Sequence, residues 1–235
     1  MKTNHSLQQF LSVAALSLLL LVGGCAPQPL KVDQTFWSKP GQRIGLALTV
    51  PAKANASRAG AQGLLDQAIN SAMAGSLEAH LATVNITALN NIVYAVSDSL
   101  KKRGQTPVVL GLVTPGALQP FKTEGSNKDY GSKDLRPAGK DKQLDAILLV
   151  EVTAVGTLRS YYGFVPISAP AGYVAADSQM VDARSNKLIW RALNTQAQPV
   201  VGEWDTPPAY ANVDQAIATA IAAMPALIAA DLMSP

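Results

Sequence analysis

Cys25 is the only cysteine of this 235-residue chain, and it lies directly behind the apolar residues 10–22 and the pair Gly23-Gly24. One cysteine cannot form a disulfide bond within one chain, so ordinary packing must stabilise the fold. The apolar run follows the basic residue Lys2 and is shorter than the roughly 20 residues of a membrane-spanning helix. A basic start, a short apolar run and small residues are typical of an export signal that is removed from the mature protein.

The sequence Val22-Gly23-Gly24-Cys25 resembles the lipobox of bacterial lipoproteins, in which an aliphatic and two small residues precede the cysteine that receives lipid. The resemblance implies cleavage after residue 24 and acylation of Cys25 with fatty acids such as palmitate. Two or more acyl chains anchor a protein far more stably than one. The resemblance also implies a location, because an aspartate directly after the lipidated cysteine directs a lipoprotein away from the outer membrane. This chain has Ala26 at that position, which favours the periplasmic face of the outer membrane. A plain cleaved signal with an incidental cysteine is the alternative.

The mature chain has room for one substantial core, because 235 residues without the first 24 leave 211. It retains 18 basic and 16 acidic side chains, and no stripe of Lys and Arg with interleaved aromatics is present. Nucleic acid is therefore not an expected partner. Residues 25–42 contain three prolines and no helical or strand period, which predicts a lipidated tether. Residues 43–235 are expected to form a single periplasmic domain.

Hydrophobic periodicity predicts helices and strands in the domain. A spacing near 3.6 residues indicates helices over 64–81 and 88–103, with Thr87 able to cap the second. Short aliphatic runs indicate strands, and small residues over 53–63 indicate a loop. The predicted strands before residue 114 are 43–50 and 106–113. A final Ala-rich helix is expected over 211–233, with Asn212 as a candidate cap and Pro225 kinking or dividing it.

Several strands follow one another late in the chain. Residues 144–158 begin as a continuous apolar run, which predicts a strand buried on both faces. A further strand over 173–181 leads into a hairpin whose turn is 184–187. Consecutive strands after an alternation of strand and helix predict an α+β fold, a mixed β-sheet with late hairpin strands packed against helices.

Two segments rich in loop signals contain aromatic residues that could bind a partner. Residues 114–143 are long and polar, so this segment is functional, disordered, or includes a short helix. Its Phe121 and Tyr130 could become ordered on contact with another protein. Aromatic residues beside prolines also lie between two predicted strands, where they could anchor a partner or close the end of the core. These are Tyr161, Tyr162 and Phe164.

Residues with catalytic or metal-binding chemistry are sparse. His80 is the only histidine of the mature chain, so no Ser-His-Asp set, Cys-His pair or His/Cys metal cluster has enough members. We expect a non-enzymatic protein without cofactor or metal. The remaining catalytic hypothesis is a hydrolase that uses carboxylates meeting across neighbouring strands, and binding of a small molecule in a cleft between sheet and helix also stays open. The candidate carboxylates are Glu151, Asp177 and Asp182.

The segments LDAILLVEVTAVGT and YVAADSQMVDARSNKLIWRA resemble a pattern in one group of bacterial envelope lipoproteins. The group includes relatives of the curli secretion channel protein, the lipoprotein activators of peptidoglycan synthases, and the amino-terminal domain of the Tol-system propeller protein. In the pattern an Asp-Ala pair opens a buried strand, and a hairpin follows that ends in an aliphatic pair and a tryptophan. The matching residues here are Asp145-Ala146, Val181-Asp182-Ala183, Leu188-Ile189 and Trp190.

This resemblance covers residues 43–113 and 144–230. In physical terms, the Asp182 carboxylate can tie down the turn and Trp190 can fill the core. The chain departs from the group in a longer insertion over 60–85, and in Ser185-Asn186 where Thr-Gly is usual. Because the nearest relatives expected in this group have no assigned activity, none is carried over to this chain.

These observations predict a lipid-anchored periplasmic accessory or adaptor protein that binds another cell-envelope component, with the membrane and an envelope protein as partners. A homo-oligomer stays open. The alternative is a subunit of an outer-membrane secretion or transport complex. A pore subunit needs a membrane-spanning hairpin with about 9–11 residues in each strand. Residues 160–173 are too short and too rich in proline for such a hairpin.

Replacing Cys25 by serine tests the predicted anchor. We expect Cys25→Ser to abolish labelling by radioactive palmitate and to release the protein from the membrane fraction, because a serine hydroxyl does not replace the thiol that accepts lipid. The control Gly24→Ala keeps a small residue before the cysteine and should still be labelled. Equal labelling of the Cys25→Ser variant and the unaltered protein would contradict the prediction.

Overall fold

The computed structural model describes residues 28–123 and 127–234. Seven strands form one sheet in the order β3-β1-β4-β6-β7, and β2 and β5 also pair with β4. β1 runs parallel to β3 and β4, whereas β6 is antiparallel to both of its neighbours, β4 and β7. The strands are β1 (Arg43–Thr49), β2 (Asn55–Ala59), β3 (Thr106–Leu112), β4 (Ala146–Tyr162), β5 (Val165–Pro166), β6 (Ala171–Asp182) and β7 (Leu188–Pro199).

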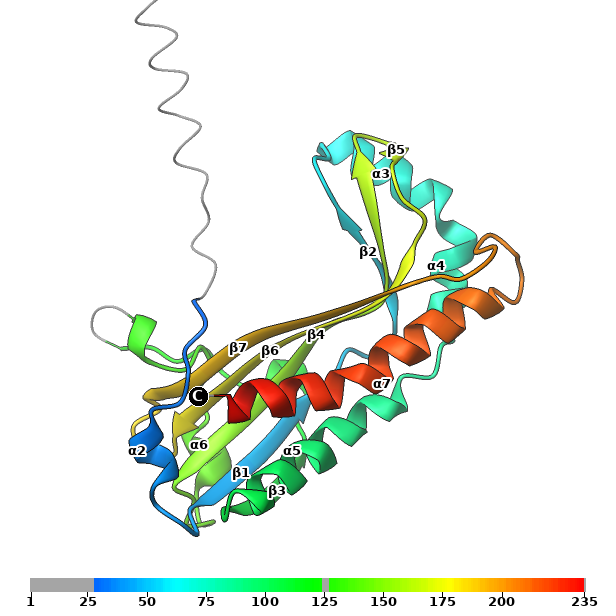
Figure 1. The fold of residues 1–235 in the computed structure, drawn as a ribbon. Helices are drawn as coiled ribbons and strands as arrows, with labels where there is room; N and C mark the ends of the chain where they lie inside the picture. The colour runs from blue at the N-terminus through cyan, green and yellow to red at the C-terminus, as the bar shows by residue number, and fades with distance from the viewer. Residues whose placement is uncertain (1–27, 124–126, 235) are drawn as a thin grey trace, which may run out of the picture.

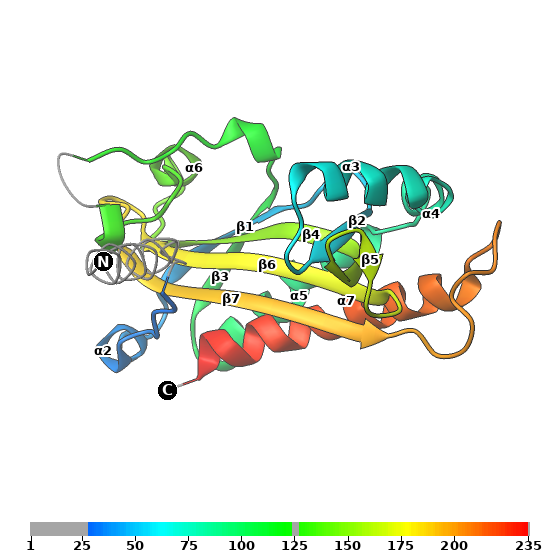
Figure 2. The ribbon, with the colours of Figure 1, turned by 90° about the horizontal axis from the view of Figure 1, so that it is seen from above.

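Two long helices lie on one face of this sheet, α5 and α7 (Figures 1 and 2). The helices are α2 (Gln34–Trp37), α3 (Leu64–Met73), α4 (Gly75–Leu81), η1 (Thr87–Asn90), α5 (Asn91–Lys102), η2 (Pro115–Ala117), η3 (Asn127–Asp129), α6 (Arg136–Gly139) and α7 (Ala211–Met233). The mixed sheet, the late hairpin and the packed helices confirm the predicted α+β fold.

Both faces of the first half of β4 are covered, as its continuous apolar run predicts. Leu148 and Val150 face the main core, which also contains the apolar sides of α5 and α7. Ile147 and Leu149 face a smaller core, which Leu135 and other residues of the segment between β3 and β4 complete. By length and composition α7 could cross a membrane, but ten of its residues are buried in the fold.

The β6–β7 hairpin confirms the roles inferred for Asp182 and Trp190. The Asp182 carboxylate accepts hydrogen bonds from the backbone N–H groups of Arg184 and Ser185, at 3.1 and 2.8 Å, and from the Ser185 hydroxyl. Asn186 adopts a left-handed conformation with φ of 62°, which a turn of this kind needs. Trp190 is 1% exposed and fills the main core.

The described part of the predicted tether, residues 28–42, lies against the domain. Leu30 exchanges two backbone hydrogen bonds of 2.9 Å with Arg191 on the edge of β7. Trp37 is buried in the main core, and the Arg103 guanidinium lies 4.8 Å from its ring centroid. The polypeptide is therefore held to the sheet from Leu30 onward. Cys25 and the predicted signal lie outside the described residues.

One predicted loop and three predicted features of helices differ in the structure. Residues 53–63 contain the strand β2, which pairs in parallel with the far half of β4. Thr87 opens the 3-10 helix η1 instead of capping an α-helix, and its hydroxyl donates to Asn85. Asn212 lies inside α7 and does not cap it, because its side-chain amide donates to the Glu203 carbonyl. Tyr210 is the residue that precedes the helix. Pro225 does not divide the final helix, because α7 is one helix from Ala211 to Met233.

Glycines allow two close backbone approaches that position the far half of the sheet. Gly156, with φ of 132°, lies where a Cβ atom would be 2.1 Å from the Asn55 carbonyl oxygen on β2. At Gly172 on β6, a Cβ atom would lie 2.2 Å from the carbonyl carbon of Ala216 on α7. No side chain fits at either point, so these glycines set the distance of β2 from β4 and of α7 from β6.

Substitution of Gly172 tests the packing of α7. We expect Gly172→Ala to lower the free energy of unfolding by about 1–3 kcal/mol or more, because the methyl group overlaps backbone atoms that must move. Urea denaturation of the full-length protein in detergent, followed by tryptophan fluorescence, measures this loss. The control Gly116→Ala adds its methyl group where no atom lies within 4 Å, and should be close to neutral. Equal stability of the two variants would contradict the prediction.

The hairpin turn also makes stability depend on pH. Burial alone would raise the pKa of Asp182, but the hydrogen bonds from Ser185 and Arg184 outweigh it and hold this pKa below its usual value. An aspartate in the unfolded chain titrates near about 3.9. The stabilising contribution is therefore complete above that pH and is lost as the pH falls through the lower pKa of the folded state.

We expect Asp182→Asn to remove this part of the acid sensitivity, because an amide does not titrate. Compared with the unaltered protein, the variant should be less stable at neutral pH, and the difference should shrink as the pH falls below about 4. Urea denaturation at several pH values measures the difference. The control Asp98→Asn changes an exposed carboxylate on α5 and should keep the acid sensitivity of the turn. A stability difference that stays constant with pH would contradict this account of Asp182.

Candidate partner-binding site

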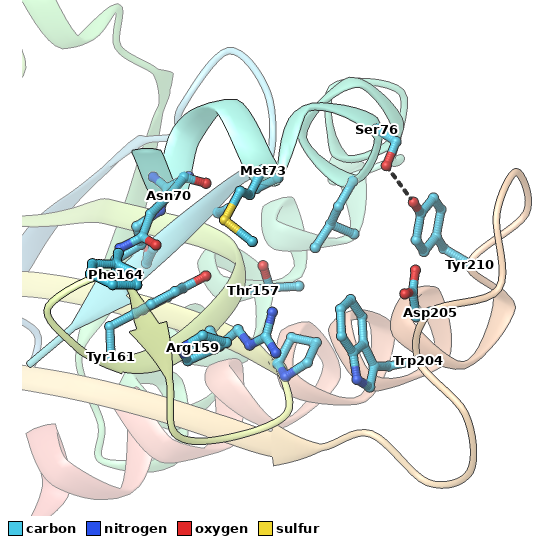
Figure 3. A pocket seen from close by; sticks show the side chains of 17 residues that line it. Asn70, Met73, Ser76, Thr157, Arg159, Tyr161, Phe164, Trp204, Asp205 and Tyr210 are labelled. Atoms are coloured by element: carbon cyan, nitrogen blue, oxygen red, sulfur yellow. Dashed lines mark hydrogen bonds between the residues drawn. The ribbon is translucent and has the colours of Figure 1, made fainter. Parts of the chain in front are cut away.

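The sheet has two distinct ends. One end, called the turn end below, contains the first residues of β1, β3 and β4 and the turn between β6 and β7. At the other end, called the pocket end below, β2, β5, α3 and α4 surround the far half of β4 (Figures 1 and 2). A cavity of about 290 Å³ lies at the pocket end, between α3, α4, β2, the end of β4 and the loop that precedes α7. Figure 3 shows side chains that line it.

Polar contacts inside the pocket end fasten α3 to the strands. Asp66 accepts the Gly63 N–H at 2.8 Å and so caps the helix N-terminus. Asn70 is 2% exposed, and its amide donates to Gln62 at 2.9 Å and to the Gly163 carbonyl at 3.2 Å. The residue that fixes α3 to the β4–β6 connection is therefore polar, and it faces inward.

Arg58 and Arg159 bring two guanidinium groups to this pocket, and their surroundings differ. Arg58 forms an ion pair with Glu78, and its Nε atom is buried without a hydrogen-bond partner among the described residues. Arg159 forms no ion pair with a carboxylate of the described residues, although Asp205 also lines the pocket. Arg159 therefore contributes a positive charge that no side-chain anion of the described chain neutralises.

Aromatic rings and one backbone contact hold Arg159 in place. Its Nε donates to the Ser168 carbonyl at 2.8 Å. Its guanidinium carbon lies 4.7 Å from the ring centroid of Trp204 and 5.8 Å from that of Tyr161, in cation–π geometry. Because two rings and a backbone carbonyl contact the group, it is pre-organised to receive an anionic group that carries an apolar part.

The apolar side of α3 faces solvent beside this pocket. Met73 is 72% exposed and also lines the pocket, as does Phe164 from the β4–β6 connection. A helix that shows its apolar side to water needs a cover, because soluble proteins rarely leave a large contiguous apolar patch exposed. The exposed apolar residues of α3 and the β4–β6 connection are Leu64, Leu65, Ile69, Met73, Tyr162, Phe164, Val165 and Ile167.

The pocket contains two of the five residues predicted for partner binding. Tyr161 is buried and Phe164 is exposed, and both line the pocket, whereas the neighbouring Tyr162 is exposed and does not line it. Phe121 and Tyr130 lie apart from them, since Tyr130 pairs with Lys187 beside the hairpin turn. Phe121 is buried and stacks on Tyr130 with ring centroids 5.2 Å apart, so this pair is already packed within the fold.

Two contributors to the pocket gave no functional signal in the sequence. Arg159 directly follows the predicted strand 144–158, and Trp204 stands in a segment whose composition indicates only a loop. The exposed side of α3 did give a signal, because its 3.6-residue period is visible in the sequence. Periodicity identifies which side chains share a face of a helix, but not whether another element covers that face.

The candidate catalytic residues do not form a catalytic arrangement among the described residues. His80 Nε2 lies 2.7 Å from the Asp214 carboxylate, while the neighbouring Ser76 hydroxyl bonds to Tyr210 and not to His80. Glu151 and Asp177 do stand opposite each other on β4 and β6, as expected for two of the three candidate carboxylates, but Asp177 is bonded to Arg191. Asp182 lies at the turn, far along β6. No group of three His, Cys, Asp or Glu that could hold a metal ion occurs in the described ranges.

No family model and no curated protein matches the sequence. Among solved structures, the chain is similar to PelC from Paraburkholderia phytofirmans, a dodecamer, with 9% identity over 85% of this chain and 95% of that one and a TM-score of 0.31. It is also similar to protein XCC0632 of Xanthomonas campestris, with 13% identity over 88% of this chain and 93% of that one and a TM-score of 0.36. Lipoprotein GNA1162 of Neisseria meningitidis is 15% identical over 76% of this chain and 98% of that one, with a TM-score of 0.27. Similarity at this level carries no functional inference.

Proposed function

We propose that this protein is a non-enzymatic, lipid-anchored accessory protein of the bacterial cell envelope that binds another envelope protein through its pocket end. The lipobox-like sequence before Cys25 supports the anchor, and Ala26 supports the outer membrane as its location. The observation that carries the binding role is the uncovered apolar side of α3 beside a pocket with an unneutralised arginine.

The pocket itself favours one kind of partner. Its volume of about 290 Å³ is just below the range of roughly 300–1,000 Å³ for small-molecule sites, and its mouth is flanked by exposed apolar side chains. A protein segment would use both features, since one apolar side chain can fill the cavity while the rest covers α3. The charge of Arg159 selects a segment with a carboxylate next to that apolar side chain.

The local chemistry supports a binding role over a catalytic one. In the described part of the chain, the single histidine is bonded to Asp214, and the nearest serine hydroxyl is bonded to Tyr210. Neither arrangement leaves a hydroxyl nucleophile next to a base, which acyl-transfer chemistry requires. Aromatic and Arg side chains at the rim are instead the residue types that contribute most to the affinity of protein interfaces.

Site-specific photo-cross-linking in living cells tests this proposal. A photoreactive phenylalanine analogue in place of Ile69 or Phe164 should form an adduct with an envelope protein, because both positions face solvent beside the pocket. The control position is Tyr94 on α5, which is 65% exposed and lies away from the pocket, and it should give no such adduct.

Two further variants distinguish specific binding at this site from non-specific cross-linking. Arg159→Glu and Met73→Asp should each abolish the adduct at position 164, since the first repels the partner's carboxylate and the second places a charge in the apolar contact. The conservative change Arg159→Lys should retain part of it. Adducts that form equally at position 94, or that persist in the Arg159→Glu variant, would overturn the proposal.

A further inference from the structure

The turn end of the sheet exposes a surplus of positive charge. Six basic side chains are exposed there, and none forms an ion pair with a carboxylate of the described chain. Carboxylates also lie at this end, Asp33, Asp141, Asp145 and Asp182, and those that accept backbone hydrogen bonds keep their negative charge, so the six basic side chains exceed these four carboxylates by two. The basic side chains are Lys39, Lys102, Lys140, Lys142, Arg184 and Lys187.

The pocket end has the opposite balance. The acidic residues around it are Asp66, Glu78, Glu203, Asp205 and Asp214, and the basic ones are Lys53, Arg58 and Arg159. The mature chain is therefore electrically polarised along the sheet, even though basic and acidic residues nearly cancel in number. A charged surface in water orients toward the opposite charge over about a Debye length, which is near 8 Å at physiological salt.

The attachment of Leu30 places the same end closest to the anchor. Leu30 is held at Arg191, three residues from the start of β7 and eight from its end, which corresponds to roughly 10 Å and 26 Å along the strand. Leu30 follows Cys25 by five positions, and this stretch spans at most about 18 Å when fully extended. With β7 upright, an acylated Cys25 therefore lets the turn end reach the bilayer, whereas the pocket end lies farther from Arg191 than this stretch can span.

From these two observations we propose that the basic turn end rests on anionic lipid headgroups and orients the domain with its pocket end away from the membrane. This inference relies on the lipid anchor of the proposed function. The acyl chains supply the attachment, and the basic side chains supply the orientation, because clusters of Lys and Arg beside a membrane anchor are attracted to anionic lipids.

Energy transfer from the protein to labelled lipid tests this orientation. The full-length, acylated protein is reconstituted into phosphatidylethanolamine vesicles with or without phosphatidylglycerol, and some lipid headgroups carry an acceptor dye. A donor dye is attached at Ser38→Cys on the turn end or at Val201→Cys on the pocket end. Because the Cys25 thiol is acylated, the introduced thiol is the only free one. We expect stronger transfer from position 38 than from position 201 when phosphatidylglycerol is present.

Two sets of substitutions with the same change in net charge provide the comparison. One set removes three positive charges from the turn end through Lys140→Gln, Lys142→Gln and Lys187→Gln. In this variant, the difference in energy transfer between donor positions 38 and 201 should fall to its value on vesicles without phosphatidylglycerol. Lys53→Glu with Gln67→Glu makes the same net change at the pocket end and should preserve the difference. Raised salt should abolish it in the unaltered protein.

The outcomes separate this inference from the anchor on which it relies. Protein that does not float with the vesicles lacks the lipid anchor, which would overturn the proposed function and the orientation together. Protein that floats but shows equal transfer with and without phosphatidylglycerol keeps its anchor and overturns only the orientation. Equal loss of the difference in both substituted proteins would also overturn it, because the effect would then follow net charge and not its position.

Discussion

The rest of the structure depends on β4, a strand of 17 residues that pairs with β1, β2, β5 and β6. Its first half pairs with β1 and β6 between two hydrophobic cores, and its second half pairs with β2 and β6 beyond the smaller core. A strand paired on both sides is rigid, because each backbone N–H and C=O group has a partner that would be lost on bending. The pocket end is therefore a continuation of the core sheet, and Arg159 and Tyr161 are positioned by the same strand that buries Leu148.

The pocket end reverses the usual arrangement of an amphipathic helix. In α3 the buried contact is the Asn70 amide, and the apolar side chains face solvent. A Leu or Met side chain contributes about 1.5–3 kcal/mol when it moves from water into a fully buried site. The apolar side of α3 gives no such stabilisation to the isolated chain, so its free energy is available to an interface. The hydrogen bonds of Asn70 keep the helix in place without using that side.

The sequence contained enough information to predict the elements whose neighbours are local or whose burial is complete. β1, β3 and the first half of β4 are continuous aliphatic runs, and the hairpin has its turn residues and Trp190 in one short segment. β2 was missed because Asn55–Ala59 has no alternation of apolar and polar residues. Its strand conformation comes from β4, which is distant in sequence, and from the absence of a side chain at Gly156.

The candidate site was only partly predictable for the same physical reason. The aromatic residues of the β4–β6 connection could be identified, because aromatics beside prolines between two strands are conspicuous. Phe121 and Tyr130 have the same local appearance, yet they stack on each other within the fold, which only the tertiary structure decides. The contact of Arg159 with Trp204 joins the end of strand β4 to the loop that precedes α7, and no local pattern encodes such a contact.

The two proposed contacts restrict each other, because they lie at opposite ends of one rigid sheet. If the turn end rests on headgroups, β7 alone places the pocket end roughly 26 Å beyond the point where the chain is attached at Arg191. A binding partner must then present its apolar and acidic segment to the pocket from the aqueous space, not from within the bilayer. An acidic pocket end is also repelled by the anionic lipid that attracts the turn end, so one charge distribution favours contact at one end and leaves the other exposed to a partner.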